Sequence, residues 1–152
     1  MTARNNALLV LCDLCRRFTS LIEPHLGRIT AMLDDPQEFI RRQALISLSS
    51  LIQEDFLRVR RGPLFFSLVM TLFDCGQEMR ELCAYVLTQV ISLKNEYLCA
   101  LNFVETLFVV NSCKDYTSFF NFSLNFCERE NRLSAQRCRA SRYKVYSILL
   151  PA

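Results

Sequence analysis

The stretch Asp35-Pro36-Gln37-Glu38-Phe39-Ile40-Arg41-Arg42-Gln43-Ala44-Leu45 decides how this chain folds, because part of it occurs three times. The segment Arg41-Arg42-Gln43-Ala44-Leu45 matches Arg4-Asn5-Asn6-Ala7-Leu8, which stands 37 positions earlier. It also matches Arg80-Glu81-Leu82-Cys83-Ala84, which stands 39 positions later. A self-match with a period of about 40 residues predicts stacked helix pairs, an α-solenoid. Proteins of this architecture usually hold other molecules rather than transform them.

Helical periodicity runs through most of the chain. In residues 4–18, apolar side chains fall three and four positions apart and so form one stripe along a helix. Only three glycines and four prolines are present, which leaves few turn signals for a many-stranded β fold. We therefore predict an all-α fold, an α-α superhelix of about three to four repeats. The expected helices cover residues 4–18, 24–33, 35–56, 63–74, 77–94, 96–111 and 137–150.

The helix start near residue 35 is the best defined. Asp35 is expected to be its N-cap, with Pro36 at the first helical position and Glu38 completing a capping box. Residues 19–24 are expected to form a turn. The segment 63–74 is apolar on almost all sides, so we expect it to be deeply buried.

Charge permits nucleic-acid contact without requiring it. The formal net charge of the 152 residues is only +3, but positive side chains gather towards the end of the chain. Four cations there have no acid among them and are candidates for contacts with DNA phosphates: Arg137, Arg139, Arg142 and Lys144. The alternative is that they form a solvated helix face.

The eight cysteines do not indicate a disulfide framework, because the sequence shows no secretion signal and most thiols occupy apolar helical positions. Cys12 and Cys15 form a CxxC motif, which is typical of redox or zinc sites. However, no second CxxC occurs, and the single histidine, His25, has no evident catalytic partner. We therefore predict core thiols, a reducing compartment, and neither metal nor cofactor. No apolar run is long enough to span a membrane.

An acid precedes the repeated arginine by six residues in two copies, Asp35 before Arg41 and Asp74 before Arg80. In stacked helix pairs the acid can cap the second helix, while the arginine projects towards the equivalent acid of the adjacent repeat. These four residues are the predicted members of an inter-repeat ladder. Arg4 is expected to pair outside its own repeat.

These residues resemble a known family. Residues 35–45 follow the HEAT-repeat pattern, and residues 4–15 closely resemble the HEAT-repeat D subunits of condensin, the condensin II type more than condensin I. Residues 51–56 and 62–66 resemble the same subunits, as do Glu128-Arg129-Glu130-Asn131-Arg132-Leu133 and Tyr143-Lys144-Val145-Tyr146. The resemblance therefore covers nearly the whole chain.

The resemblance implies a non-catalytic subunit that acts in mitotic chromosome condensation, in the nucleus and on chromosomes. In such complexes the SMC subunits hydrolyse ATP, and the HEAT subunits bind DNA, chromatin and the kleisin. The implied partners are therefore the kleisin and SMC subunits and chromatin or DNA, with histones included and membranes excluded.

The family protein is several times longer, so the chain is expected to be a fragment. Its predicted parts are HEAT repeats over 1–111 that start in mid-repeat, an irregular insertion over 112–130, and a basic region with a final helix over 131–152. Two alternatives stay open. One is another HEAT or armadillo adaptor, of the transport-receptor or phosphatase-scaffold type. The other is a metal or thiol enzyme built on Cys12, Cys15 and His25.

Overall fold

The structure, a computed structural model, describes residues 2–59, 62–74, 76–95, 97–110 and 145–149. All regular structure within these ranges is helical, with no strand, so the all-α prediction is confirmed. The chain divides into two compact units, Met1–Arg60 and Arg61–Ala152. The predicted boundaries near residues 111 and 130 lie outside the described residues.

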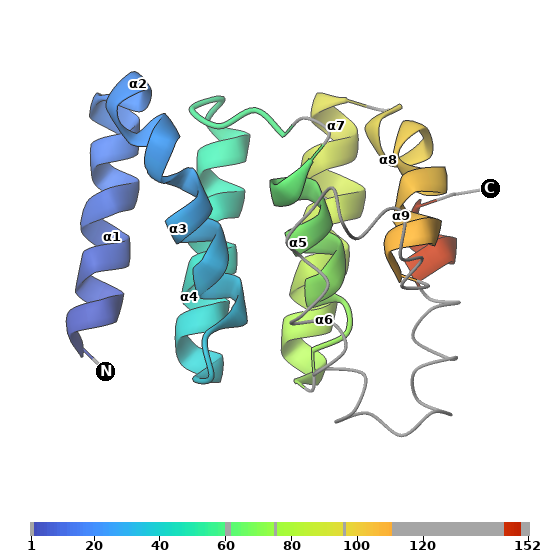
Figure 1. Cartoon of the computed structure of the whole chain (residues 1–152), viewed down its shortest axis with the longest axis horizontal. Helices are drawn as coiled ribbons and strands as arrows, with labels where there is room; N and C mark the ends of the chain where they lie inside the picture. The colour runs from blue at the N-terminus through green and yellow to red at the C-terminus, as the bar shows by residue number, and fades with distance from the viewer. Residues whose placement is uncertain (1, 60–61, 75, 96, 111–144, 150–152) are drawn as a thin grey trace. The chain divides into compact units, whose positions relative to one another are not determined.

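The first unit is built on two long helices, α1 (Thr2–Arg17) and α4 (Glu38–Gln53), which pack against each other (Figure 1). Short elements connect them: α2 (Thr19–Ile22), η1 (Glu23–His25), α3 (Leu26–Ala31) and η2 (Met32–Asp34), where η1 and η2 are 3-10 turns. The side chains that form the core of this unit are apolar and nearly inaccessible to solvent: Leu8, Cys12, Cys15, Ile22, Ile29, Leu33, Ile40, Ala44, Leu45, Leu48, Leu51, Ile52 and Leu57.

Two sequence predictions for this unit are wrong. Residues 19–24 are helical rather than a turn. Phe18 leaves the helical region (φ −138°, ψ 63°), and α2 then begins while the Thr19 hydroxyl donates to the Cys15 carbonyl at 3.0 Å. In addition, α4 begins at Glu38 with Gln37 as its N-cap, not with Asp35. Asp35 instead forms a tight turn, in which its carboxylate accepts from the Gln37 amide at 2.9 Å, and the helix begins only after that turn, at Glu38.

A left-handed residue follows the C-cap of α4, Glu54. Asp55 has a φ of 63°, a conformation that glycine adopts more easily than other residues. The terminal carbonyls are satisfied locally, because the Glu54 amide donates to the Ser50 carbonyl at 2.9 Å and the Leu57 amide to the Leu51 carbonyl at 3.1 Å.

The second unit contains α5 (Pro63–Thr71), α6 (Gln77–Tyr85), the π-helix η3 (Val86–Ile91), α7 (Ser92–Lys94), α8 (Leu98–Leu101) and α9 (Phe103–Val110). α5 packs against both α6 and α9. The prediction that the apolar segment 63–74 is deeply buried is confirmed for the described core residues of this segment: Phe65, Phe66, Leu68, Val69, Met70, Leu72 and Phe73.

The predicted helix over residues 77–94 is present, but its middle is a π-helix rather than an α-helix. The Ser92 hydroxyl donates to the Leu87 carbonyl five residues earlier, at 3.1 Å, which fits the wider π spacing. Of the predicted final helix, residues 145–149 are described and helical. Val145 and Leu149 are buried, and the ring of Tyr146 meets that of Phe103 edge-on, with centroids 5.9 Å apart.

Candidate functional site

The acid–arginine motif, which is Asp35 with Arg41 in one copy and Asp74 with Arg80 in the other, folds in the same way in both copies. The Asp35 carboxylate accepts a hydrogen bond from the Gln37 amide at 2.9 Å, and the Asp74 carboxylate accepts one from the Gly76 amide, also at 2.9 Å. A short polar side chain that binds the amide two residues ahead forms a tight turn. In both repeats the acid therefore shapes the entry into the next long helix, α4 or α6.

The arginine of each motif completes the turn. Arg41 Nη1 donates to the backbone carbonyl of Asp35 at 2.9 Å, and Arg80 Nη1 donates to the backbone carbonyl of Asp74 at 2.7 Å. A guanidinium on a peptide carbonyl is a charge-assisted hydrogen bond. The spacing of six residues is thus explained, because it brings the arginine, one helical turn into the helix, back to the carbonyl of its own acid.

Neighbouring copies of the motif are also joined by an ion pair. Arg4 Nη1 lies 2.6 Å from Oδ2 of Asp35, and the Asp35 side chain is only 8% exposed, whereas that of Arg4 is 50% exposed. The first repeat thus contributes the arginine and the second repeat contributes the acid. The next step of the predicted ladder would join Arg41 to Asp74, which belong to different units, and it stays a prediction.

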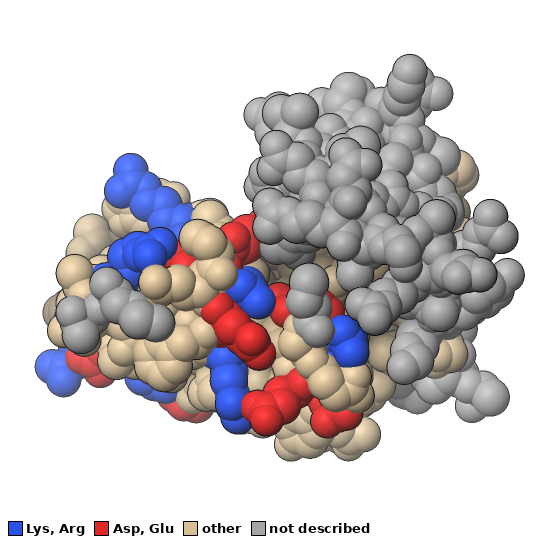
Figure 2. All heavy atoms as spheres, turned by 90° about the horizontal axis from the view of Figure 1, so that it is seen from below, with Lys and Arg blue, Asp and Glu red and all other residues tan. Residues whose placement is uncertain are grey.

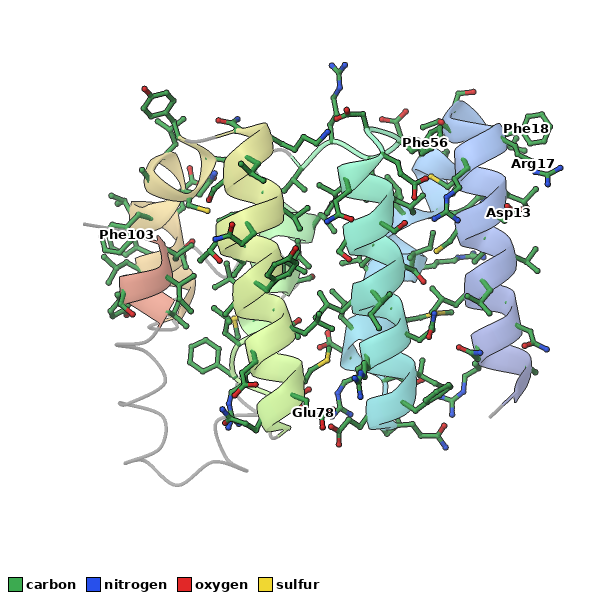
Figure 3. The ribbon with its side chains drawn as sticks, turned by 180° about the vertical axis from the view of Figure 1, so that it is seen from behind. Asp13, Arg17, Phe18, Phe56, Glu78 and Phe103 are labelled. Carbon is green, nitrogen blue, oxygen red and sulfur yellow. The ribbon has the colours of Figure 1, made fainter. Side chains whose placement is uncertain are left out.

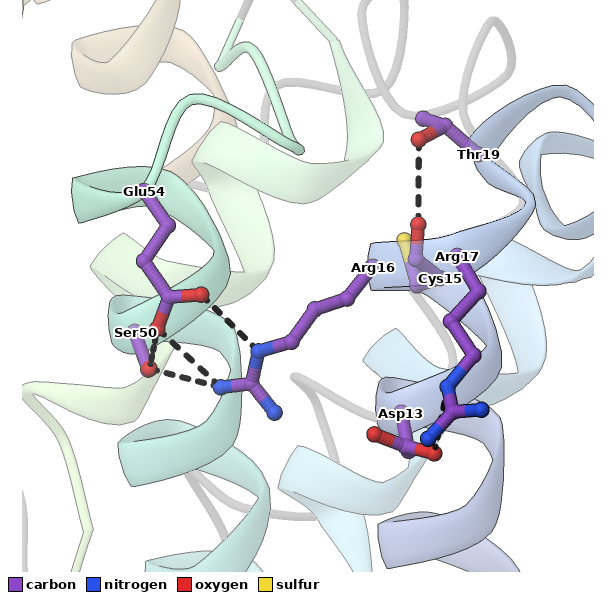
Figure 4. A network of polar contacts seen from close by, with 7 residues as sticks. All are labelled: Asp13, Cys15, Arg16, Arg17, Thr19, Ser50 and Glu54. Atoms are coloured by element: carbon purple, nitrogen blue, oxygen red, sulfur yellow. Dashed lines mark hydrogen bonds and ion pairs between the residues drawn. The ribbon is translucent and has the colours of Figure 1, made fainter.

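A second polar network joins the carboxyl ends of α1 and α4 (Figure 4). Arg16 binds Glu54 with two nitrogens, Nε to Oε2 at 2.9 Å and Nη2 to Oε1 at 3.1 Å. The Ser50 hydroxyl donates to Glu54 Oε1 at 2.6 Å and accepts from Arg16 Nη2 at 2.9 Å. The hydrogen bond to Glu54 raises the pKa of Arg16, and the bonds from Arg16 and Ser50 lower the pKa of Glu54.

Sequence reasoning missed this network. Arg16 stood out only as half of a basic pair with Arg17, and nothing in the spacing of 38 residues between Arg16 and Glu54 indicates a contact. One usable signal exists, because the separation of 38 residues is close to the repeat shift of 37. Arg16 and Glu54 therefore stand at nearly equivalent positions of two adjacent repeats, which places the ends of α1 and α4 near each other. Arg17 instead pairs with Asp13 on the exposed side of α1 at 3.4 Å (Figure 3).

The four cysteines in the described part of the chain, Cys12, Cys15, Cys83 and Cys99, lie in the cores of the two units. Cys12 and Cys15 are almost fully buried, and burial raises the pKa of both thiols. The Cys83 thiol donates to the Leu68 carbonyl at 2.9 Å, and burial raises its pKa as well. His25 is exposed in η1. Among the described residues, no three His, Cys, Asp or Glu side chains are grouped so as to hold a metal ion.

The four predicted DNA-contact residues, Arg137, Arg139, Arg142 and Lys144, lie outside the described residues. On the face that Figure 2 presents, the described cations and acids are interspersed rather than separated into a block of one sign. None of the helices in the described part of the chain is long and apolar enough to cross a membrane.

Two long helices joined by short elements, with a repeated acid–arginine turn at the start of the second, define a helical-repeat protein. Residues 2–134 match the family model described as non-SMC mitotic condensation complex subunit 1, and the chain belongs to that family. The prediction of a condensin D subunit is thereby confirmed at the level of the family.

Curated relatives agree with this assignment. The chain is 31% identical over 152 residues to the condensin-2 complex subunit CAP-D3 of Arabidopsis thaliana, with 97% of the chain and 12% of the relative covered. It is 31% identical over 148 residues to the condensin-2 complex subunit D3-L of Xenopus laevis, covering 97% of the chain and 10% of the relative. It is 31% identical over 153 residues to the condensin-2 complex subunit D3 of Mus musculus, covering 99% of the chain and 10% of the relative.

The chain thus spans about a tenth of the length of these curated relatives. No solved structure matches it.

Proposed function

We propose that this chain is a non-catalytic scaffold segment of a condensin D subunit and acts in mitotic chromosome condensation in the nucleus. The observation that carries the proposal is the family match over residues 2–134. The repeated acid–arginine turn supports a scaffold role, because its charged groups stabilise the helix pairs and are directed at backbone groups rather than at a substrate.

The proposed partners are the kleisin and SMC subunits of condensin, together with chromatin. The relatives are named as subunits of the condensin-2 complex, and extension of that membership to this chain is our inference. The test is co-purification of the tagged chain from mitotic extract, followed by identification of the bound proteins. A tagged Ala44→Gln variant, which we expect to disrupt the core of the first unit, serves as the matched control.

Enrichment of SMC and kleisin subunits with the wild-type chain, and their loss with the variant, is the expected result. If the wild-type chain is folded and recovers other proteins but no condensin subunit, the proposal fails. Recovery of transport or phosphatase proteins would instead favour the alternative adaptor function. Metal analysis of the reduced protein tests the enzyme alternative, for which the buried thiols of Cys12 and Cys15 give no support.

We further propose that the ladder continues beyond its first step, with Arg41 directed to Asp74 as Arg4 is to Asp35. The support is the equivalence of the local geometry around the two acids. A double-mutant cycle of Arg41→Gln with Asp74→Asn measures this pairing. A coupling free energy indistinguishable from zero contradicts it.

The proposed DNA contacts are Arg137, Arg139, Arg142 and Lys144, and binding through them should be weak, independent of sequence and steeply dependent on salt. Neutralising all four should reduce the slope of log affinity against log salt by up to roughly 0.9 for each DNA phosphate that the variant no longer neutralises. Arg16→Gln with Arg17→Gln is the control, since both residues form ion pairs within the first unit. An unaltered slope in the quadruple variant would mean that the four cations form a solvated surface.

A further inference from the structure

The corner between α1 and α2 brings two arginines close to two hydroxyl groups. In the segment Arg16-Arg17-Phe18-Thr19-Ser20-Leu21, Arg16 stands three residues before Thr19, and Arg17 stands three residues before Ser20. Of all serines and threonines in the chain, only these two follow an arginine by three residues. Kinases select substrates partly by charge pattern, and a carboxylate in a substrate groove can bind a guanidinium with two hydrogen bonds. The segment therefore holds two candidate phosphorylation sites.

Thr19 and the arginine before it are both engaged in the fold. The Thr19 hydroxyl donates to the Cys15 carbonyl at 3.0 Å, which holds the first residue of α2 against the end of α1 (Figure 4). Arg16 binds Glu54 with two nitrogens, and one of these also donates to the Ser50 hydroxyl. A kinase that used Arg16 and Thr19 would have to break both sets of contacts.

Ser20 and Arg17 stand at the surface with weaker contacts. Ser20 is exposed, and its hydroxyl forms no hydrogen bond with any residue that the structure describes. The Arg17 side chain is 70% exposed, and its ion pair with Asp13, at 3.4 Å, is one that solvent and other charges readily replace (Figure 3). Leu21, which follows Ser20, is 65% exposed. The arginine, the acceptor hydroxyl and the apolar residue after it are therefore all accessible.

The backbone at this corner has already left the helical path. Phe18 has a φ of −138° and a ψ of 63°, and its side chain is 57% exposed. The amides of Leu21 and Ile22 both donate to the Phe18 carbonyl, at 3.0 and 3.3 Å. A short segment held by few hydrogen bonds opens locally at small cost. A kinase groove can thus take up residues 17–21 while the core of the first unit stays folded.

We propose that Ser20 is a phosphorylation site for a basophilic kinase, one that binds the guanidinium of Arg17 three residues before the acceptor. The kinase transfers the γ-phosphoryl group of ATP to Ser20 Oγ. The Oγ–P bond forms as the bond from the γ-phosphorus to the β–γ bridging oxygen breaks, ADP leaves, and the hydroxyl proton passes to the catalytic carboxylate of the kinase.

The phosphate changes the chemistry of the corner. It adds about −1.5 to −2 charge at neutral pH, at a position between Phe18 and Leu21 in the sequence. This charge opposes burial of the two exposed apolar side chains against a partner. It also offers Arg17 a stronger anion than the Asp13 carboxylate. Phosphorylation thereby converts a basic and apolar corner into an acidic one.

The test is phosphorylation of the full chain by the catalytic subunit of cAMP-dependent protein kinase with ATP, with the site located by fragmentation mass spectrometry. The expected product carries phosphate on Ser20, and Ser20→Ala removes it. Arg17→Gln should lower kcat/KM by about tenfold or more, because a charge-assisted hydrogen bond to the kinase is lost. Arg16→Gln is the matched control, since it removes the same charge one residue earlier, and it should leave kcat/KM close to the wild-type value. Circular dichroism checks that each variant is folded.

Three outcomes would overturn the proposal. The first is a folded chain that takes up no phosphate on Ser20. The second is phosphate on Thr19 that Arg16→Gln abolishes, because the contacts of Thr19 and Arg16 would then not protect them. The third is a Ser20 that only casein kinase 2 modifies and that Glu23→Gln protects, since the kinase would then recognise the acid three residues after the acceptor rather than the arginine before it.

Discussion

Arg4 of the first repeat and Asp35 of the second form an ion pair, with 2.6 Å between Nη1 and Oδ2, across 31 residues of sequence. Asp35 takes part in two further contacts. Its other carboxylate oxygen accepts from the Gln37 amide, and its backbone carbonyl accepts from Arg41. One acidic residue thus ties the start of α4 to its own turn and to the preceding helix.

This geometry predicts a measurable coupling between Arg4 and Asp35. In a double-mutant cycle of Arg4→Gln with Asp35→Asn, asparagine keeps an acceptor for the Gln37 amide, so the cycle reports mainly on the ion pair. Because Arg4 is half exposed, we expect about 0.2–1 kcal/mol of coupling in urea unfolding. The exposed pair Asp13–Arg17 is the control and should couple less. Equal coupling in both cycles would contradict a special role for Asp35.

Ala44 should tolerate no larger polar side chain. It is fully buried in α4, where that helix packs against α1. Ala44→Gln overpacks this contact and buries an amide, so it should lower the free energy of unfolding by about 1–3 kcal/mol or more. Ile46→Gln on the exposed side of α4 should change it by no more than about 0.5 kcal/mol. Similar melting temperatures for the two variants would show that Ala44 does not lie in the core.

Two buried threonines should respond in opposite ways to substitution by valine. The Thr106 hydroxyl is buried and forms no hydrogen bond, so Thr106→Val should raise the free energy of unfolding by about 1 kcal/mol or more. The Thr71 hydroxyl donates to the Ser67 carbonyl at 2.9 Å. Thr71→Val removes this hydrogen bond and should lower the free energy of unfolding by about 0.5–1.5 kcal/mol. Urea unfolding measures both. Destabilisation by Thr106→Val would indicate that its hydroxyl has a bound partner, such as water.

Much of the fold could be predicted because its determinants are local or periodic. The self-match located the long helices of both units, and the acid–arginine spacing located the turn that opens α4 and α6. The wrong N-cap at Asp35 shows where local rules compete. Aspartate favours the N-cap position, but it also favours a tight turn closed by the amide two residues ahead, and Asp35 forms that turn with Gln37 before α4 begins at Glu38. The π-helix η3 has no signal in hydrophobic periodicity, which does not separate 3.6 residues per turn from a slightly wider helix.

The candidate contacts were less predictable, because they depend on how two helices are rotated against each other. The contact of Arg16 with Glu54 requires both side chains to lie on the facing sides of α1 and α4. Sequence spacing within one helix cannot give that relation. The predicted DNA-contact cations rest on charge alone and stay a prediction.

The Arg16–Glu54–Ser50 network should make stability depend on pH in the acid range. Hydrogen bonds from Arg16 first, and Ser50 second, lower the pKa of Glu54 in the folded chain below its unfolded value. The contribution of Glu54 is therefore present above the unfolded pKa and is lost as the pH falls through the folded pKa. Glu54→Gln should reduce stability at neutral pH and flatten the loss of stability between about pH 5 and pH 3. Glu23→Gln, at an exposed glutamate of η1, is the control. Urea unfolding across this pH range measures the effect. If the free energy of unfolding falls as steeply with decreasing pH in Glu54→Gln as in the wild type, the network does not form in solution.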